Sequence, residues 1–184
     1  PVSLTSLEQR NEPAIHEQLQ AISFMFSWPG LRTFGREFAH QPTPLSEEYQ
    51  LLFDRGQAIY RELCTTCHGP DGRGLISPDG KNLLAPPLPE SPRLEENREA
   101  AIQIMLHGLA GELDGKTYEG LMAPFGATND DEWVASILTF VRHEWGNSGS
   151  VVLPSHVAAT REKFQNRTRP WNQKELTWKL PKDK

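Results

Sequence analysis

The chain has 184 residues, of which 37% are hydrophobic and 23% are charged, and its formal net charge is -5. This balance indicates a globular protein, and the length favours one domain with extensions. The negative charge argues against a nucleic-acid partner or an anionic membrane surface. The most apolar stretch, residues 21–28, is too short to cross a bilayer, so no transmembrane segment is predicted.

Residues 1–45 are predicted to be an N-terminal extension or the end of a preceding domain. They contain a short amphipathic stretch at residues 15–26 and close with a proline-rich run at residues 41–44, which is typical of a linker. The sequence starts at Pro1 with neither an initiator methionine nor a signal region. We therefore expect a processed product or a piece of a longer chain.

The first strong helix signal begins at Ser46, a favourable N-cap that is followed by two glutamates. Apolar or small residues then recur at spacings of three and four, which is the helical period. These residues are Tyr49, Leu52, Phe53, Gly56, Ile59, Tyr60 and Leu63. Because the stripe ends at Cys64, this helix leads directly into the cysteines.

Residues 69–92 show no periodicity and are rich in glycine and proline, which predicts a long loop that binds a ligand. A second helix is expected at about residues 97–109. A third is expected to begin after Asn129, which resembles a capping box with Glu132, and to end at Gly146. One short helix is expected in the tail. Strand signals are weak throughout, so the predicted fold class is mainly α.

Both cysteines of the chain lie in the sequence Cys64-Thr65-Thr66-Cys67-His68. This C-x-x-C-H pattern is that of a c-type haem attachment site. In this interpretation each cysteine bonds one vinyl group of the haem, and His68 ligates the iron as the proximal ligand. A flat apolar macrocycle would also fill a core that a few short helices and two long loops fill poorly.

Three other interpretations of the motif stay open. It could be a dithiol redox pair, although such a pair normally opens a helix after a strand and this one ends a helix. It could be half of a zinc site, although structural zinc needs four ligands and the chain has no further cysteine. It could also be a plain disulfide or a chance match.

Met122 is the predicted second axial ligand of the iron. It lies in a non-periodic stretch between two predicted helices, where glycine and proline allow the backbone to approach a ligand closely. Met25 belongs to the N-terminal extension, and Met105 lies on the apolar face of a helix, where packing explains it better. The alternative is a second histidine, His107, although a histidine at a helix C-terminus is more simply a cap.

Together these features resemble a class I c-type cytochrome over about residues 46–146. The resemblance is carried by the helix with Gly56, by CTTCHGPDGRG and APPL, by the loop methionine and by the last aromatic-bearing helix. It implies a class I cytochrome c fold, with three to four short helices around a covalently bound haem c. Residues 147–184 are expected to be a C-terminal tail that wraps this domain.

The resemblance also assigns roles to single residues. It implies that Gly56 and Phe53 cross the last helix closely, with Phe140 or Val141 as the partner.

In the same way, the carbonyl of Pro86 or Pro87 is expected to accept a hydrogen bond from His68, and we select Pro87 as the binding residue. Arg73 is expected near a haem propionate.

Residues 106–126 and 138–147 resemble cytochrome domains that are fused to or paired with bacterial quinoprotein dehydrogenases for sugars or alcohols. Ala123, where that family often has proline directly after the methionine, is a departure. The resemblance implies a periplasmic or other extracytoplasmic single-electron carrier and not an enzyme in itself. Its donor would be a PQQ-dependent dehydrogenase domain or partner, and its acceptor another cytochrome or a terminal oxidase.

Two other functions remain open on the sequence. One is a haem enzyme or a gas or redox sensor, which needs a displaceable sixth ligand. The other is an interaction module in which the haem serves only to stabilise the fold.

Overall fold

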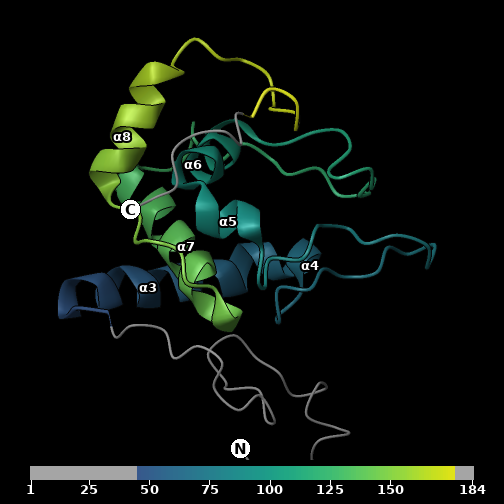
Figure 1. Cartoon of the computed structure of the whole chain (residues 1–184), viewed down its shortest axis with the longest axis horizontal. Coiled ribbons are helices and arrows are strands. Elements are labelled where there is room, and N and C mark those ends of the chain that lie inside the picture. The colour runs from purple at the N-terminus through teal and green to yellow at the C-terminus, as the bar shows by residue number, and fades with distance from the viewer. Residues whose placement is uncertain (1–44, 177–184) are drawn as a thin grey trace, which may run out of the picture.

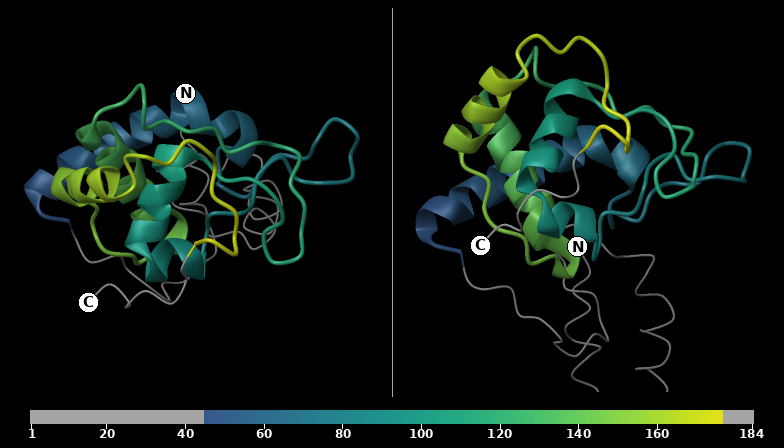
Figure 2. Two further views of the ribbon diagram at one scale, coloured as in Figure 1. Left: turned by 90° about the horizontal axis from the view of Figure 1, so that it is seen from above. Right: turned by 45° about the horizontal axis from the view of Figure 1, so that its top comes forward.

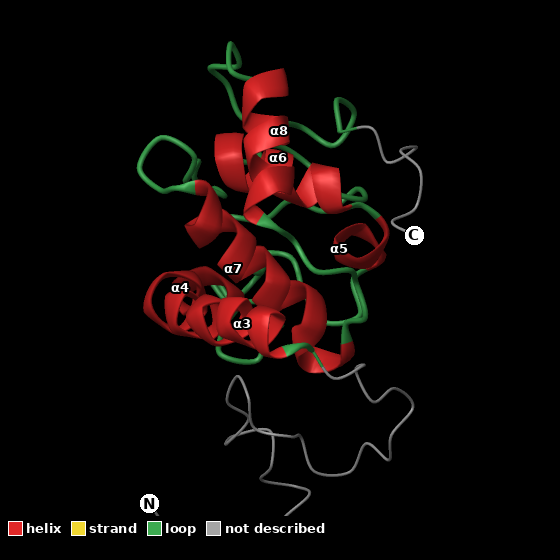
Figure 3. Ribbon diagram, turned by 90° about the vertical axis from the view of Figure 1, so that its left-hand side faces the viewer, coloured by secondary structure: helices red, strands yellow, loops and turns green. Residues whose placement is uncertain are grey.

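The computed structural model describes residues 45–176, and its regular elements are helices (Figure 1). Helix α3 (Glu47–Ile59) continues through a π-helical turn (Tyr60–Cys64) into the short helix α4 (Thr65–His68). They are followed by α5 (Pro92–Glu96), α6 (Arg98–His107), α7 (Asp131–His143), a 3-10 turn (Glu144–Gly146) and α8 (Pro154–Lys163). Within the described residues no strand forms, and only isolated bridges join the loops (Figure 3). The mainly α fold class is confirmed.

Two predicted helix starts are confirmed by their caps. The hydroxyl of Ser46 accepts a hydrogen bond from the backbone N–H of Tyr49 at 3.4 Å, at the start of α3. The side chain of Asn97 accepts one from the N–H of Ala100 at 3.0 Å, at the start of α6. Each side-chain oxygen satisfies an N–H that the first helical turn leaves without a partner.

The start of α7 differs from the prediction by one residue. Asp130 is the N-cap, because its carboxylate accepts a hydrogen bond from the N–H of Trp133 at 2.7 Å. The amide of Asn129 instead donates to the carbonyl of Phe125 at 3.0 Å. The helix also ends earlier than predicted, at His143.

The predicted loop of residues 69–92 contains one unforeseen feature at its end. A five-residue helix, α5, begins there with Pro92 at its first position. Proline suits this position because it has no N–H that would need a partner.

The close crossing of α3 and α7 is the centre of the fold. A Cβ atom on Gly56 would lie 2.0 Å from the carbonyl oxygen of Ser136 and 2.7 Å from Cβ of Phe140, so only glycine fits. One turn earlier, the rings of Phe53 and Phe140 pack with centroids 5.1 Å apart. The predicted contact of Gly56 and Phe53 with Phe140 is therefore confirmed.

The residues after α7 pack onto the same core. Val152 and Val157 are fully buried in the hydrophobic cluster that contains the α7 side chains. Arg142 of α7 is also fully buried, and its guanidinium donates to the carbonyls of Leu94 and Ser150. Figure 2 shows the chain after α8 turning back across α6.

Two long loops, residues 69–91 and residues 108–130, extend to the same side of the helices (Figure 1). The first loop holds the predicted APPL motif and the second holds Met122. Across residues 45–176, every helix is too short or too polar to cross a membrane. The predictions for residues 1–44, including those for Met25, lie outside the described residues.

Candidate functional site

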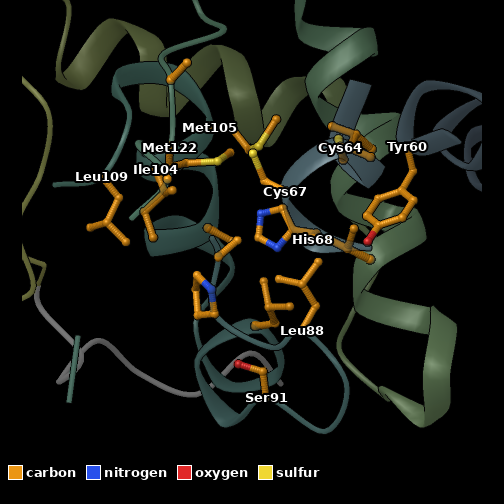
Figure 4. A pocket seen from close by; sticks show the side chains of 18 of the residues that line it. Tyr60, Cys64, Cys67, His68, Leu88, Ser91, Ile104, Met105, Leu109 and Met122 are labelled. Atoms are coloured by element: carbon orange, nitrogen blue, oxygen red, sulfur yellow. The ribbon is translucent and has the colours of Figure 1, made fainter. Parts of the chain in front are cut away.

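A mostly apolar cavity of about 340 Å³ lies between the helices and the two long loops (Figure 4). Five of the six predicted site residues lie on its wall, namely Cys64, Cys67, His68, Pro87 and Met122. The cysteine motif and the methionine come from separate parts of the chain, which are described in turn below.

The cysteine side of the cavity is helical. Cys64 ends the π-helical turn, and Cys67 lies in α4, so the two thiols lie one helical turn apart. Both cysteines are free and half-buried. Burial, with the nearby Cys67 thiol adding to it, raises the pKa of Cys64 to about 12. A dithiol redox pair needs a thiol of lowered pKa, so this environment argues against that interpretation.

His68 ends α4, and Gly69 stops the helix with a φ of 74°. Burial lowers the pKa of His68 to about 4, although a hydrogen-bonding interaction with the backbone of Pro86 opposes this effect. The imidazole is therefore neutral at pH 7, which is the form that ligates a metal. The buried Nδ1 atom of His68 has no hydrogen-bond partner at a normal distance and angle. Its interaction with the Pro86 backbone is therefore long or poorly aligned. Pro87, the residue selected from the sequence, lines the cavity beside Pro86.

The turn after His68 is fixed from behind by a tyrosine. The hydroxyl of Tyr60 donates to the carbonyl of Gly69 at 2.7 Å. Burial raises the pKa of Tyr60 far above its usual value, and the neighbouring Cys64 and Asp71 add smaller contributions in the same direction. The phenol therefore remains a neutral donor at every physiological pH.

The methionine side of the cavity is a loop held by backbone hydrogen bonds. The carbonyl of Met122 accepts from the N–H of Leu109 at 3.1 Å. Two residues before Met122, the N–H of Gly120 donates to the carbonyl of Leu84 at 2.8 Å. Three residues after it, the N–H of Phe125 donates to the carbonyl of Met105 at 2.9 Å. Figure 4 shows the Met122 side chain extending toward the space beside the His68 ring.

The two competing ligands from the sequence lie in different environments. Met105 is buried in the core of α6 and also lines the cavity. His107 is not among the residues that line it, and its ring instead faces Trp171, with centroids 6.4 Å apart. Burial, with the charge of Arg167 adding to it, lowers the pKa of His107. The expected role of His107 as a protonated helix cap therefore does not agree with its surroundings.

The arginine that lines the cavity is not the one that was selected from the sequence. Arg73 does not line the cavity: its side chain is 63% exposed, and its guanidinium lies 3.8 Å from the Asp71 carboxylate. Arg93, at the start of α5, does line it and forms an ion pair with Asp114. Burial lowers the pKa of Arg93. Apart from His68, Arg93 is the one ionisable basic residue among those that line the cavity. In the sequence, the one feature that could have pointed to Arg93 is its position directly after the proline-rich loop.

Residues 52–141 match the family model described as cytochrome C oxidase, cbb3-type, subunit III. No curated protein matches the chain. The match spans just under half of the 184 residues. It supports a c-type cytochrome domain, which is an electron-transfer module, and the mainly helical structure is consistent with the class I fold. Such a domain implies covalently bound haem c, with iron, as the cofactor.

The cavity fits this cofactor. Its wall is mostly apolar, as a porphyrin requires, and it carries two thiols, a neutral buried imidazole and a thioether. Within residues 45–176 no three His, Cys, Asp or Glu side chains gather into a group that could hold a metal ion. This distribution disfavours the zinc interpretation of the cysteine motif.

Proposed function

We propose that this c-type cytochrome domain carries single electrons through a haem c that is attached at Cys64 and Cys67 and ligated by His68 and Met122. The main support is that the His68 imidazole and the Met122 thioether enter one apolar cavity from separate segments, beside both thiols. When bound, haem c supplies an iron that gains and loses one electron.

The two axial residues are held in place by the protein. His68 ends a helix that continues from α3, and the Met122 backbone is bonded to Leu109. Because both segments are held by contacts within the protein, we expect the reorganisation on electron transfer to be small. A thioether ligand raises the reduction potential relative to a second histidine. Pro86 is the group best placed to orient His68, with Pro87 next to it as the alternative.

Arg93 is the residue that we assign to a haem propionate, in place of Arg73. A guanidinium matches a carboxylate in geometry and in charge, and Arg93 is partly buried at the cavity wall. Asp114 holds this guanidinium by an ion pair, which limits the orientations that it adopts.

Two exposed leucines mark the side from which a partner would approach. Leu63 and Leu121 both line the cavity, yet they are 50% and 66% exposed. Apolar side chains at such a wall suit a small and transient contact, as electron-transfer complexes use.

The donor that we propose is a PQQ-dependent dehydrogenase, as a domain of the same protein or as a partner. The resemblance of residues 106–126 to the cytochrome domains of such enzymes supports it. The acceptor would be another cytochrome or a terminal oxidase, and the matching family model is named for an oxidase subunit. Because haem c is attached outside the cytoplasm in proteins of this kind, we propose a periplasmic or other extracytoplasmic location.

Absorption spectra of the oxidised and reduced holoprotein test the ligand set. We expect a thioether-to-ferric charge-transfer band in the wild type and in Met105→Leu, and its loss in Met122→Ala. Met105→Leu is the matched control because this methionine lines the same cavity. A band that survives in Met122→Ala would reject Met122 as the ligand. Ready binding of carbon monoxide to the wild-type ferrous protein would favour a sensor or haem enzyme instead.

Rapid mixing of oxidised holoprotein with a reduced PQQ-dependent dehydrogenase tests the donor. We expect fast haem reduction that Leu121→Glu slows, because the new charge lies at the proposed contact surface. Reduction that is equally slow in both proteins would contradict the proposed donor.

A further inference from the structure

We propose that residues 164–176, the segment after α8, form a clasp that positions the Met122 loop, with Trp171 as the positioning residue. This inference rests on the proposed ligation of the haem iron by Met122. The clasp lies outside residues 52–141, which match the family model.

The clasp is joined to Met122 through a single intervening segment, residues 108–110. Leu109 forms an antiparallel bridge with Met122 and a parallel bridge with Trp171. The N–H of Trp171 donates to the carbonyl of Gly108 at 3.0 Å, and the N–H of Ala110 donates to the carbonyl of Trp171 at 2.8 Å. On the other side of this segment, the N–H of Leu109 donates to Met122 at 3.1 Å. A shift of residues 108–110 therefore shifts the backbone of Met122.

The packing at Gly108 leaves little freedom for such a shift. Its φ is 80°, and a Cβ atom there would lie 2.5 Å from the carbonyl oxygen of Met122. The two backbones are in direct contact, so a displacement caused by the clasp is not absorbed by flexible side chains.

Trp171 is the anchor of the clasp. Its side chain is buried against α6, with 6% of its surface exposed. The guanidinium of Arg167 lies over its ring at 3.5 Å from the centroid, and the ring of Phe164 packs edge-on at 5.1 Å. Glu175 binds both Arg167, at 2.8 Å, and Arg169. Ile104 and Leu109, which line the haem cavity, belong to the same cluster, so the anchored tryptophan borders the cavity wall from outside.

A second connection runs from the clasp to the arginine of the cavity. The side chain of Gln173 accepts from the N–H of Asp114 at 2.7 Å and donates to its carboxylate at 2.6 Å. Asp114 in turn forms the ion pair with Arg93. The clasp therefore supports both the methionine loop and the proposed propionate contact.

Imidazole titration of the ferric holoprotein tests the clasp, because imidazole binds the iron only when Met122 is displaced. We expect Trp171→Ala to raise the apparent imidazole affinity at least about tenfold, since a looser loop populates the displaced state more. Trp171→Phe keeps an aromatic ring in the pocket and should stay within about threefold of the wild type. The thioether-to-ferric band should weaken in step with the affinity change.

Val157→Ala is the matched control. Val157 is fully buried on α8 and removing its methyl groups destabilises the core, but its side chain does not belong to the clasp. We expect its imidazole affinity to stay within about twofold of the wild type. Gln173→Ala removes a surface contact of the clasp without opening the core, and should raise the affinity about threefold.

The outcomes separate this inference from the proposed function. A wild-type protein without the charge-transfer band would reject Met122 as ligand, and the clasp inference with it. A wild-type protein with the band, combined with wild-type affinity in Trp171→Ala and Gln173→Ala, would overturn the clasp alone. Equal affinity changes in Trp171→Ala and Val157→Ala would also overturn it, because general loss of stability would then explain both.

Discussion

The two sides of the cavity are built in different ways. On the cysteine side, Cys64 lies in the π-helical turn that continues from α3, and Cys67 and His68 lie side by side in α4, the next turn of the chain. On the methionine side, Met122 lies in a loop held by hydrogen bonds to residues distant in sequence, such as Leu84 and Leu109. One proposed ligand, His68, is thus positioned by local structure, and the other, Met122, by long-range contacts.

This difference predicts different responses to mutation. Helix α3 continues into the cysteine motif and also makes the central crossing with α7. A destabilising substitution in α3 should therefore unfold the whole domain. Met122 and Phe125 of the methionine loop pack against this core only as partly buried side chains. A destabilising substitution in this loop should therefore release the proposed ligand while the domain stays folded. The predictions below test this contrast.

The largest effect is expected for Gly56→Ala, on the cysteine side. The added Cβ atom would meet the carbonyl oxygen of Ser136 at 2.0 Å and force α3 and α7 apart. We expect the free energy of unfolding to fall by about 3 kcal/mol, measured by urea denaturation of the holoprotein.

The sign of this change is diagnostic. In an open helix, glycine to alanine would stabilise the protein by up to about 1 kcal/mol, so any gain in stability would contradict the close crossing. Leu51→Ala is the control on the same helix. Its side chain is 72% exposed, and we expect a change within about 0.5 kcal/mol.

The next largest effect is expected for Gly120→Ala, on the methionine side. Its Cβ atom would lie 2.3 Å from the carbonyl oxygen of Leu84, so the loop must move away from its partner. We expect a loss of about 2 kcal/mol in unfolding free energy, together with loss of the thioether-to-ferric band in protein that is still folded.

Lys116→Ala, at the exposed tip of the same loop, should leave both the stability and the band unchanged. If Gly120→Ala unfolded the domain before the band changed, the two sides of the cavity would not differ as the structure indicates.

The same contrast explains what the sequence could predict. The Ser46 cap, the start of α6 near Asn97 and the motif around His68 are set by neighbours along the chain, so local patterns were sufficient to predict them. The contact of Gly56 with Phe140 is long-range, and it was reached through the resemblance to a known fold rather than through any local pattern.

The features that were missed depend on the path of the chain in space. Asn129 and Asp130 are both good cap residues, and only the final loop geometry selects Asp130. Arg73 lies near the start of one long loop and Arg93 lies in α5 directly after it, and the course of this loop decides which arginine reaches the cavity. The proposed role of Trp171 depends on a return of the chain across α6, which no periodicity in the tail could reveal.

A smaller effect is expected for Tyr60→Phe. It removes the hydroxyl that donates to Gly69 at 2.7 Å and leaves that buried carbonyl without this donor. We expect the free energy of unfolding, measured by urea denaturation of the holoprotein, to fall by about 1 kcal/mol, because the turn after His68 is less fixed. Tyr49→Phe, a half-buried tyrosine of α3, should leave the stability unchanged. Similar losses in both variants would contradict the role of the Tyr60 hydroxyl.

The smallest effect is a pH dependence of the clasp. Burial opposes ionisation of Glu175, but hydrogen bonds from Arg167 and Arg169 outweigh it and lower the pKa of this carboxyl below its usual value. A lowered pKa means that its stabilising contribution is present above the ordinary carboxyl pKa and disappears as the pH falls through the lowered value. The clasp should therefore loosen in acid and not in base.

Hydrogen exchange at the Ala110 amide reports this change directly, because that N–H donates to the carbonyl of Trp171 at 2.8 Å. We expect its protection factor to stay constant above the ordinary carboxyl pKa of about 4.3 and to fall as the pH drops below it, ahead of the amides at the α3–α7 crossing. In Glu175→Gln the protection should be lower at the start and nearly independent of pH over this range. If the Ala110 amide lost protection together with the α3–α7 crossing, the methionine side would open only by global unfolding, and the clasp would not act as a separate support.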